Sequence, residues 1–345
     1  MEVSVTVHSS QFPEQLEAEL LESLRTRKLN HKFLYEGRRQ ARKWQVIHQK
    51  YSPSRSDDDT QKLFESVFDS VATQVKSPAA HVIGLGCGTG TKDVQLLNKI
   101  RNRGIMLVYT ACDTSVPLVL TARQKALEIL DTRHVHDIVA DLLTAEDLER
   151  VLITQTTGNS TRVITFIGMI PNFEPGEILD RVSTFLRPDD VLVFSANLAP
   201  GDDYCAGVEK VLPQYDNPET RDWLLGGISE IGLERQDGEL EFTIEDDEDS
   251  QDLLRIAADF VFSIDRTIEK SGEKFVFRAG DKLRVFYSYH HTPKTARDWL
   301  NRANIIVTDE QLTENQEEAI FICRKLAPEG SDTPLAIPSA RKPSS

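Results

Sequence analysis

The stretch His81-Val-Ile-Gly-Leu-Gly-Cys-Gly-Thr-Gly90 decides the fold, because a short apolar run leads directly into closely spaced glycines. The run from His81 to Leu85 predicts a buried strand, and the pattern from Lys92 to Ile100 predicts a helix. Glycines at such a junction let a ligand approach the backbone N–H groups at the start of a helix. The stretch therefore predicts a ligand-binding turn between a strand and a helix.

Short apolar runs and amphipathic segments alternate after this turn, which is typical of the βαβ units of a parallel sheet. The further expected strands are 106–111, 138–140, 162–167 and 190–195, and the further expected helices are 116–130 and 175–185. Two later apolar runs, 305–307 and 319–323, are expected to close the sheet after a helix at 292–303. This order predicts an α/β fold built on a doubly wound sheet.

The alternation is interrupted on both sides of this core. Before it, we expect helices between residues 16 and 47, a loop at 51–59 and a helix at 60–75. Between 200 and 280 we expect an inserted substrate subdomain with a helix at 215–231, a strand at 240–244 and an acidic run at 245–252, most simply a solvated turn or edge. A strand at 282–289 follows. We divide the chain into an N-terminal helical part (1–75), a core (76–199), the insertion (200–280), C-terminal core strands (281–327) and a Pro/Ser-rich tail expected to be disordered (328–345).

Composition excludes several function classes. The 345 residues carry 40 Lys and Arg against 55 Asp and Glu, which gives a formal net charge of −15. Such a surface repels nucleic-acid phosphates and anionic membranes, and no stretch approaches the roughly 18 apolar residues of a membrane span. The cysteines are scattered with no C-x-x-C pair, which disfavours a zinc site and a disulfide framework. We expect a cytoplasmic protein, monomeric or homodimeric, whose partner is a small molecule.

Two acidic residues at expected strand ends indicate a nucleoside ligand. Asp113 follows the glycine turn by roughly the 20 residues expected for an acid that binds ribose hydroxyls. Asp141 ends the next strand and is followed by Leu142. Both aspartates could instead simply cap the following helices, but three neighbouring strand ends that converge on one ligand favour binding.

The glycine spacing does not fit a dinucleotide-binding motif, which would require G-x-G-x-x-G. The form Gly86-x-Gly88-x-Gly90 resembles the first motif of class I S-adenosylmethionine-dependent methyltransferases. That resemblance implies a Rossmann-like sheet with an antiparallel closing strand, a substrate-binding subdomain and S-adenosylmethionine as cofactor. It also implies that Gly86 and Gly88 line the cofactor site and that Asp141 and Leu142 hold the adenine.

A more specific resemblance extends from about Phe33 to Lys325. The chain resembles the histidine Nα-methyltransferases of ergothioneine biosynthesis and the related 4-dimethylallyltryptophan N-methyltransferases of ergot-alkaloid pathways. The matching segments are 33–37, 51–55, 85–92, 109–115, 139–142, 166–175, 214–216 and 280–289.

The family resemblance assigns roles to individual residues. It implies that Tyr51 and Lys92 contact the cofactor, Lys92 through the cofactor carboxylate, although Lys92 could also be a solvent-facing lysine of the first helical turn. It implies that Tyr35, Asn172 and Tyr215 hold the amino-acid group of the substrate.

The sequence departs from the family at three positions. Histidine enzymes carry a glutamate two residues before a serine on the recognition strand, whereas here Ser288 is kept and Phe286 replaces the acid. Gly84 stands where many methyltransferases carry an acid that contacts the cofactor ammonium, and Pro171 precedes Asn172 where the family has glycine in a longer block.

The replacement at position 286 changes the expected substrate. Loss of a carboxylate that would bind an imidazole N–H removes a reason to prefer histidine, and phenylalanine favours an apolar or aromatic ring. Phe286 could alternatively be an ordinary core residue. We therefore expect an N-methyltransferase of alkaloid or secondary metabolism acting on the α-amine of an aromatic amino acid, best represented by 4-dimethylallyl-L-tryptophan.

Methyl transfer from a sulfonium needs positioning more than acid–base chemistry. The sequence indicates no general base, and we expect His290 and His291 to be surface residues. Three alternatives stay open: a histidine Nα-methyltransferase, a nicotinamide oxidoreductase on the same sheet, and a non-catalytic, methyltransferase-like regulator.

Overall fold

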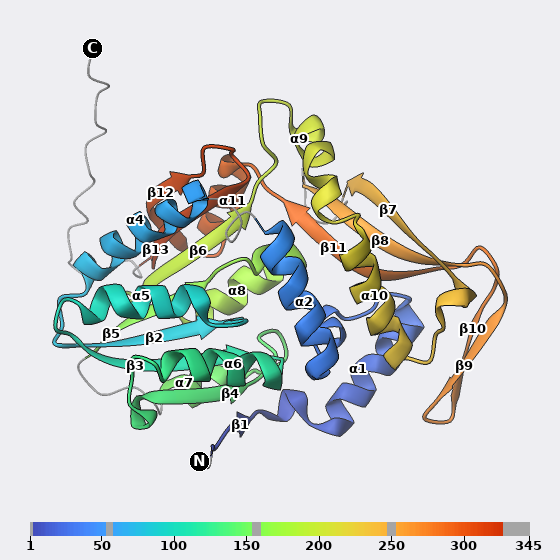
Figure 1. The fold of residues 1–345 in the computed structure, drawn as a ribbon, viewed down its shortest axis with the longest axis horizontal. Coiled ribbons are helices and arrows are strands. Elements are labelled where there is room, and N and C mark those ends of the chain that lie inside the picture. Colours follow the sequence, from blue (N-terminus) through green and yellow to red (C-terminus); the bar gives the residue numbers. More distant parts are fainter. Residues whose placement is uncertain (1–2, 53–57, 154–159, 247–252, 327–345) are drawn as a thin grey trace.

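The structure is a computed structural model, and it describes residues 3–52, 58–153, 160–246 and 253–326. The chain forms a large α/β core and a smaller part built on an antiparallel sheet, with helices α2 and α10 between them (Figure 1). Among the described helices, none is long and apolar enough to cross a membrane. The tail 328–345 and most of the acidic run 245–252 lie outside the described residues.

The core sheet has the strand order β1-β4-β3-β2-β5-β6-β13-β12. Its parallel strands are β1 (Thr6–Val7), β2 (Ala79–Leu85), β3 (Met106–Asp113), β4 (Val135–Val139), β5 (Ser160–Phe166) and β6 (Val191–Asn197). Two further strands complete the sheet, β12 (Ile305–Leu312) and β13 (Glu318–Lys325). Strand β13 pairs antiparallel with β6, and β12 pairs antiparallel with β13. The predicted doubly wound sheet with an antiparallel closing strand is confirmed.

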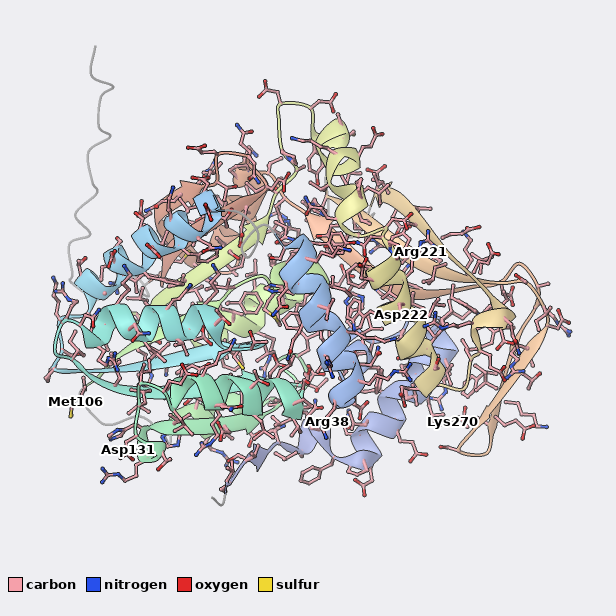
Figure 2. The ribbon with its side chains drawn as sticks, viewed as in Figure 1. Arg38, Met106, Asp131, Arg221, Asp222 and Lys270 are labelled. Atoms are coloured by element: carbon pink, nitrogen blue, oxygen red, sulfur yellow. The ribbon has the colours of Figure 1, made fainter. Side chains whose placement is uncertain are left out.

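Helices cover both faces of the core sheet. One face packs against α4 (Asp58–Gln74), α5 (Thr91–Arg101) and α6 (Val116–Ala126). The other face packs against α7 (Leu148–Ile153), α8 (Pro175–Phe185) and α11 (Pro293–Arg302). Burial of apolar side chains on both faces explains why the parallel strands are nearly continuous hydrophobic runs. At the start of β3, Met106 is 70% exposed (Figure 2), whereas Asp113 ends the same strand in a cavity.

The smaller part combines segments from both ends of the chain. Its three-stranded antiparallel sheet consists of β7 (Gly238–Asp246), β8 (Leu254–Phe262) and β11 (Lys282–His290), beside the hairpin β9 (Arg266–Lys270) and β10 (Glu273–Phe277). Helices α1 (Pro13–Thr26), α2 (Gly37–Tyr51), α9 (Tyr204–Val211) and α10 (Pro218–Glu230) pack around it. Lys43 on α2 pairs with Asp222 on α10 at 2.7 Å, and Asp222 is labelled in Figure 2.

Three features differ from the sequence-based expectations. Strand β11 pairs with β8 rather than with a core strand, so residues 282–290 belong to the smaller sheet and not to the C-terminal core strands. Helix α9 lies before the expected helix 215–231, and strands β8 to β10 lie after the expected strand 240–244, in two stretches for which we expected no regular elements. The short edge strand β1 pairs with β4 and extends the core sheet by one strand.

Candidate functional site

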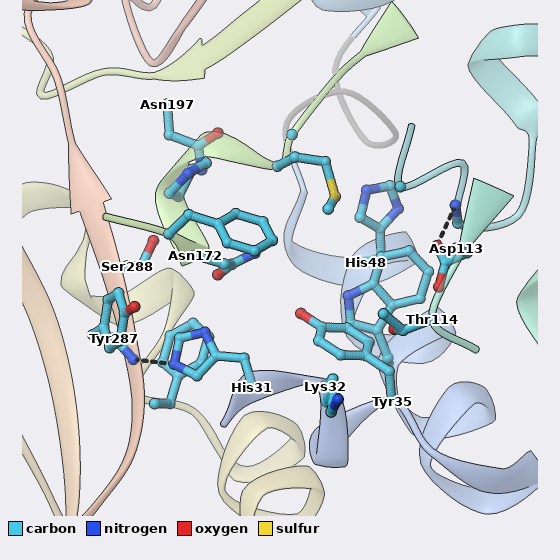
Figure 3. A pocket seen from close by; sticks show the side chains of 18 of the residues that line it. His31, Lys32, Tyr35, His48, Asp113, Thr114, Asn172, Asn197, Tyr287 and Ser288 are labelled. Carbon is cyan, nitrogen blue, oxygen red and sulfur yellow. Dashed lines mark hydrogen bonds between the residues drawn. The ribbon is translucent and has the colours of Figure 1, made fainter. Parts of the chain in front are cut away.

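One cavity of about 620 Å³ lies at the carboxyl edge of the core sheet, where the smaller part covers it (Figure 3). Every residue that the sequence assigned to cofactor or substrate lines this cavity. On the cofactor side these are Tyr51, Gly86, Gly88, Lys92, Asp113, Asp141 and Leu142, and on the substrate side Tyr35, Asn172, Tyr215, Phe286 and Ser288. The structure thus brings together residues that are separated by more than half of the chain.

The glycine turn after β2 is built so that a ligand can lie against bare backbone. Gly86 and Gly88 have φ values of 65° and 52°, a left-handed conformation that disfavours other residues. A Cβ on Gly86 would collide with the side chain of Met169, and one on Gly88 would lie 3.1 Å from the Trp44 ring. The turn therefore has no free space for side chains at these two positions, and both glycines border the cavity.

Asp113 is positioned by the same turn. Its carboxylate accepts a hydrogen bond from the backbone N–H of Gly88 at 3.0 Å (Figure 3) and another from that of Ser115 at 2.9 Å. Burial nevertheless raises the pKa of Asp113 to about 6, and these N–H groups oppose that shift. An ionised Asp113 still has lone pairs that can accept hydrogen bonds from a ribose.

Lys32, which the sequence did not indicate, lies at the predicted adenine end of the site. The ammonium of Lys32 lies 3.2 Å from Oδ2 of Asp141 and also pairs with Glu19. Asp141 additionally accepts a hydrogen bond from the Leu143 backbone, while its own N–H donates to Ser10. Asp141 is thus tied to the N-terminal segment as well as to the core.

Two predicted cofactor contacts have partners within the protein. The Lys92 ammonium lies 3.5 Å from the centroid of the Phe64 ring on α4, rather than pointing into bulk solvent. The Tyr51 hydroxyl donates to Glu219 on α10 at 2.6 Å. Both side chains still border the cavity.

Tyr215 lies at the centre of a hydrogen-bond chain on the substrate side. Its phenol oxygen accepts from Nδ2 of Asn197 at 3.2 Å and from Oγ of Ser288 at 3.0 Å. Two donors directed at one hydroxyl leave its own hydrogen available for an acceptor in the cavity. Burial also raises the pKa of Tyr215, so the phenol keeps that hydrogen. This arrangement suits a ligand carboxylate.

Tyr35 lies between the two sides of the cavity. Its ring makes edge contacts with Trp44 at 5.9 Å and with Trp223 at 5.4 Å. Burial raises the pKa of Tyr35, so it is also a neutral phenol. Asn172 enters from the short 3-10 helix η4 (Ile170–Asn172), which follows β5.

Aromatic rings surround Phe286. The Phe286 side chain is 5% exposed, stacks on His31 at 5.2 Å with an interplanar angle of 19°, and lies about 6 Å from the rings of Tyr215 and Trp223. Phe286 belongs to the core of the smaller part and also lines the cavity. The two readings of this residue are therefore compatible.

His31 has a defined tautomer. The backbone N–H of Tyr287 donates to Nε2 of His31 at 3.2 Å (Figure 3), so Nε2 is the unprotonated nitrogen and Nδ1 carries the hydrogen. Burial lowers the pKa of His31 to about 3, and the neighbouring carbonyl of Asn172 opposes that shift. The imidazole is neutral and its acceptor nitrogen is already used.

The expectation that His290 and His291 lie at the surface is wrong. His290 is 2% exposed because it ends the buried strand β11, and His291, the next residue, is fully buried where it bridges to Leu198. His290 lines the cavity two residues beyond Ser288, and burial lowers its pKa to about 4. Both residues are neutral at physiological pH.

The sequence contained a signal for two cavity residues that were not predicted, Trp44 and His48. Trp44 and His48 line the cavity, with their rings stacked at 5.0 Å, and Tyr51 follows on the same face of α2. This spacing of four and then three residues marks one side of a helix. His31, Asn197 and Trp223 show no comparable pattern, because each reaches the cavity from a different element.

The lining of the cavity falls into two chemically different halves. One half offers a backbone cradle and carboxylates suited to a nucleoside, and the other offers neutral phenols, amides and aromatic rings. Among the described residues, no group of three His, Cys, Asp or Glu side chains could hold a metal ion. The geometry suits a group transfer that depends on positioning.

A comparison with protein families gives a match over most of the chain. A family model described as "Histidine-specific methyltransferase, SAM-dependent" matches residues 16–325. No curated protein matches the sequence.

Solved structures with a similar chain path include several methyltransferases. The CcbJ methyltransferase from Streptomyces caelestis is 12% identical, with a TM-score of 0.40 over 80% of this chain and 99% of that chain. Magnesium protoporphyrin IX methyltransferase from Synechocystis PCC 6803, with bound SAH, is 12% identical, with a TM-score of 0.41 over 82% and 93% of the two chains.

Proposed function

This chain belongs to the histidine-specific, S-adenosylmethionine-dependent methyltransferase family, and from that membership we propose that it methylates the α-amine of an aromatic amino acid. The activity as a methyltransferase and the cofactor S-adenosylmethionine follow from the family. The acceptor is our proposal: a tryptophan derivative such as 4-dimethylallyl-L-tryptophan, within alkaloid or secondary metabolism.

The aromatic surroundings of Phe286 carry this proposal. The rings packed against it belong to His31, Tyr215 and Trp223, and none of these side chains is acidic. The acceptor nitrogen of His31 is already used by the backbone N–H of Tyr287. A ring that requires a hydrogen-bond acceptor, such as imidazole, is therefore served poorly here, whereas an apolar-substituted indole gains burial and stacking.

The residues of the cavity divide into two groups by task. The glycine turn, Asp113, Asp141 and Lys92 would hold S-adenosylmethionine, which supplies an electrophilic methyl group on a sulfonium. Tyr35, Asn172 and Tyr215 would hold the amino-acid group of the acceptor, and the Tyr215 hydroxyl would donate to its carboxylate.

Catalysis in such a site comes from alignment. The neutral phenols and rings would keep water out and direct the amine lone pair toward the methyl group. The amine would lose its proton before transfer, to solvent or to a neighbouring polar group.

A histidine Nα-methyltransferase is the second candidate, because the matching family model is described as histidine-specific. This candidate requires a recognition of imidazole that does not use an acid at position 286. A hydrogen bond from Nδ1 of His31 to the substrate ring is the alternative that the cavity offers.

The test is mass spectrometry of the purified protein incubated with S-adenosylmethionine and, separately, tryptophan, 4-dimethylallyl-L-tryptophan, tyrosine and histidine. We expect a mass gain of one or more methyl groups on an indole amino acid. In the matched variant Phe286→Glu, turnover of the indole amino acid should fall by about tenfold or more, because a buried charge replaces an apolar side chain. The same variant should gain turnover on histidine. Methylation of histidine alone by the unaltered protein would refute the proposed acceptor.

A further inference from the structure

Asp93 is a buried carboxylate at the cofactor end of the cavity that no role assigned so far uses. It lies in the first turn of α5, is 3% exposed, and borders the cavity next to Lys92. Its oxygens accept hydrogen bonds from the hydroxyls of Tyr109 at 2.7 Å and Thr165 at 2.6 Å. These donors come from β3 and β5, so Asp93 lies between three elements of the core.

The two hydroxyls do not neutralise Asp93. Each donates a hydrogen bond and neither carries a positive charge, so the carboxylate keeps unused lone pairs. Among the described residues, no Lys, Arg or His forms an ion pair with it, although the side chain is almost fully buried. A buried carboxylate of this kind is costly unless a cation joins it.

Gly84 leaves the space that Asp93 fills. A Cβ on Gly84 would overlap Oδ2 of Asp93 and would lie 3.1 Å from its Cγ. The carboxylate of Asp93 therefore occupies the place where a side chain at the end of β2 would otherwise be. The acid missing from position 84 has a counterpart in space that comes from α5.

The cofactor brings the matching charge. The amino-acid end of S-adenosylmethionine is a zwitterion, with a carboxylate and an ammonium on one carbon. Lys92 and Asp93 are adjacent in sequence and present opposite charges to one cavity. We propose that the Asp93 carboxylate binds the ammonium group of the cofactor, in place of an acid at position 84.

This proposal rests on the cofactor and not on the identity of the acceptor. Two other readings compete with it. Asp93 could act only as a clamp between Tyr109 and Thr165. Alternatively, the cofactor ammonium could bind to Glu318. This residue is a second buried carboxylate of the same cavity, and the charge of Lys92 acts on it.

Binding of two ligands separates these readings. The probes are S-adenosylhomocysteine and its deaminated analogue, which lacks only the ammonium, measured by titration calorimetry at pH 7.5. The unaltered protein should bind the first roughly 10- to 100-fold more tightly, the range expected for a charge-assisted hydrogen bond. Asp93→Asn should remove most of this preference by weakening the first ligand and leaving the analogue within about twofold.

Each alternative outcome decides against the proposal. Equal weakening of both ligands by Asp93→Asn would mean a purely structural clamp. Loss of the preference in Glu318→Gln, with Asp93→Asn retaining it, would place the ammonium at Glu318. An unaltered protein that binds neither ligand would overturn the cofactor assignment itself, and this proposal with it.

A second variant covers the case in which Asp93→Asn does not fold. The double variant Gly84→Asp/Asp93→Ala returns the acid to the end of β2 and removes the side chain with which it would collide. It should recover a preference of about tenfold or more for S-adenosylhomocysteine. A folded double variant that binds both ligands equally would contradict the proposal.

Discussion

Asp113 shows how burial and hydrogen bonding compete at a single residue. Removal from water raises the pKa of its carboxyl to about 6, while backbone N–H groups of Gly88, Thr114 and Ser115 stabilise the ionised form. The result is an acid that is ionised at neutral pH but protonates just below it. Its proposed task, accepting hydrogen bonds from ribose hydroxyls, requires the ionised form.

Cofactor affinity should therefore depend on pH through Asp113. When the pH falls through about 6, Asp113 gains a proton and loses acceptor capacity, so the dissociation constant of S-adenosylhomocysteine should rise. We expect little change from pH 8 to 7 and an increase of about fivefold from pH 6 to 5, measured by titration calorimetry. Asp113→Asn should bind more weakly and lack this dependence. A variant with the same pH profile as the unaltered protein would contradict the assignment.

The substrate side has a different character, because two histidines and two tyrosines that line it are neutral. Burial lowers the pKa of His31 and His290 and raises that of Tyr35 and Tyr215. Each group is thus held in its uncharged form at physiological pH. Neutral donors can orient a zwitterionic amino acid without stabilising the protonated amine, which must lose its proton before it can accept a methyl group.

At the scale of elements, the glycine turn joins two helices as well as a strand. Gly90 has φ 67° and precedes α5, and a Cβ on it would lie 2.7 Å from Cβ and 2.8 Å from Cα of Ala122 on α6. This close approach packs α5 against α6 beneath the cofactor site. The glycine is required for both conformation and space.

Gly90→Ala should accordingly destabilise the core. We expect the free energy of unfolding to fall by roughly 2–4 kcal/mol, from the left-handed conformation together with overpacking against α6. Gly104→Ala is the matched control, because Gly104 has φ 77° but no atom within 4 Å of an added Cβ; it should cost only about 1 kcal/mol. Urea unfolding measures both. Equal losses would show that the packing against Ala122 contributes nothing.

The core elements could be predicted because their signals are local. Strands β2, β3, β5 and β6 are apolar runs bounded by polar turns, and the expected helix 175–185 coincides with α8. Helix α9 gave no such signal, since it is short and contains Gly207, whose added Cβ would meet the backbone of Ala199 and Pro200. Strand β8 is buried along almost its whole length, so it lacks the alternation that marks a surface strand.

Whether a site residue could be predicted also depended on whether its signal was local in the sequence. The glycine turn and Asp113 belong to one local motif whose spacing can be read directly. Tyr215 and Phe286 could be located only through family resemblance. His31 and Trp223 escaped because their role arises from tertiary packing against Phe286, which no local pattern encodes.

At the scale of the whole molecule, the core and the smaller part meet at Glu174. This residue lies two positions after Asn172 and immediately before α8. Its carboxylate accepts a hydrogen bond from the Tyr289 hydroxyl on β11 at 2.6 Å and lies 3.3 Å from the Lys28 ammonium. Arg255 on β8 donates to the same Tyr289 oxygen at 3.0 Å. These contacts connect the segment that carries Asn172 to the sheet that carries Phe286 and Ser288.

Tyr289→Phe should therefore loosen the substrate half of the cavity without disturbing the cofactor half. We expect the KM for the amino-acid acceptor to rise roughly tenfold, as for loss of a hydrogen bond to a charged group. The dissociation constant of S-adenosylhomocysteine should stay within about twofold, because the predicted cofactor contacts of the glycine turn and Asp113 belong to the core sheet and not to β11.

The control for this variant lies on the same strand. Lys282 begins β11 and forms an exposed pair with Glu241 at 3.2 Å, so Lys282→Ala should change neither constant measurably. Steady-state kinetics and calorimetry on both variants give the comparison. If Tyr289→Phe weakened both ligands equally, the contact with Glu174 would support the general fold rather than the alignment of the two parts. An unchanged KM would mean that the smaller part is held over the core without this contact, by the packing of α2 and α10.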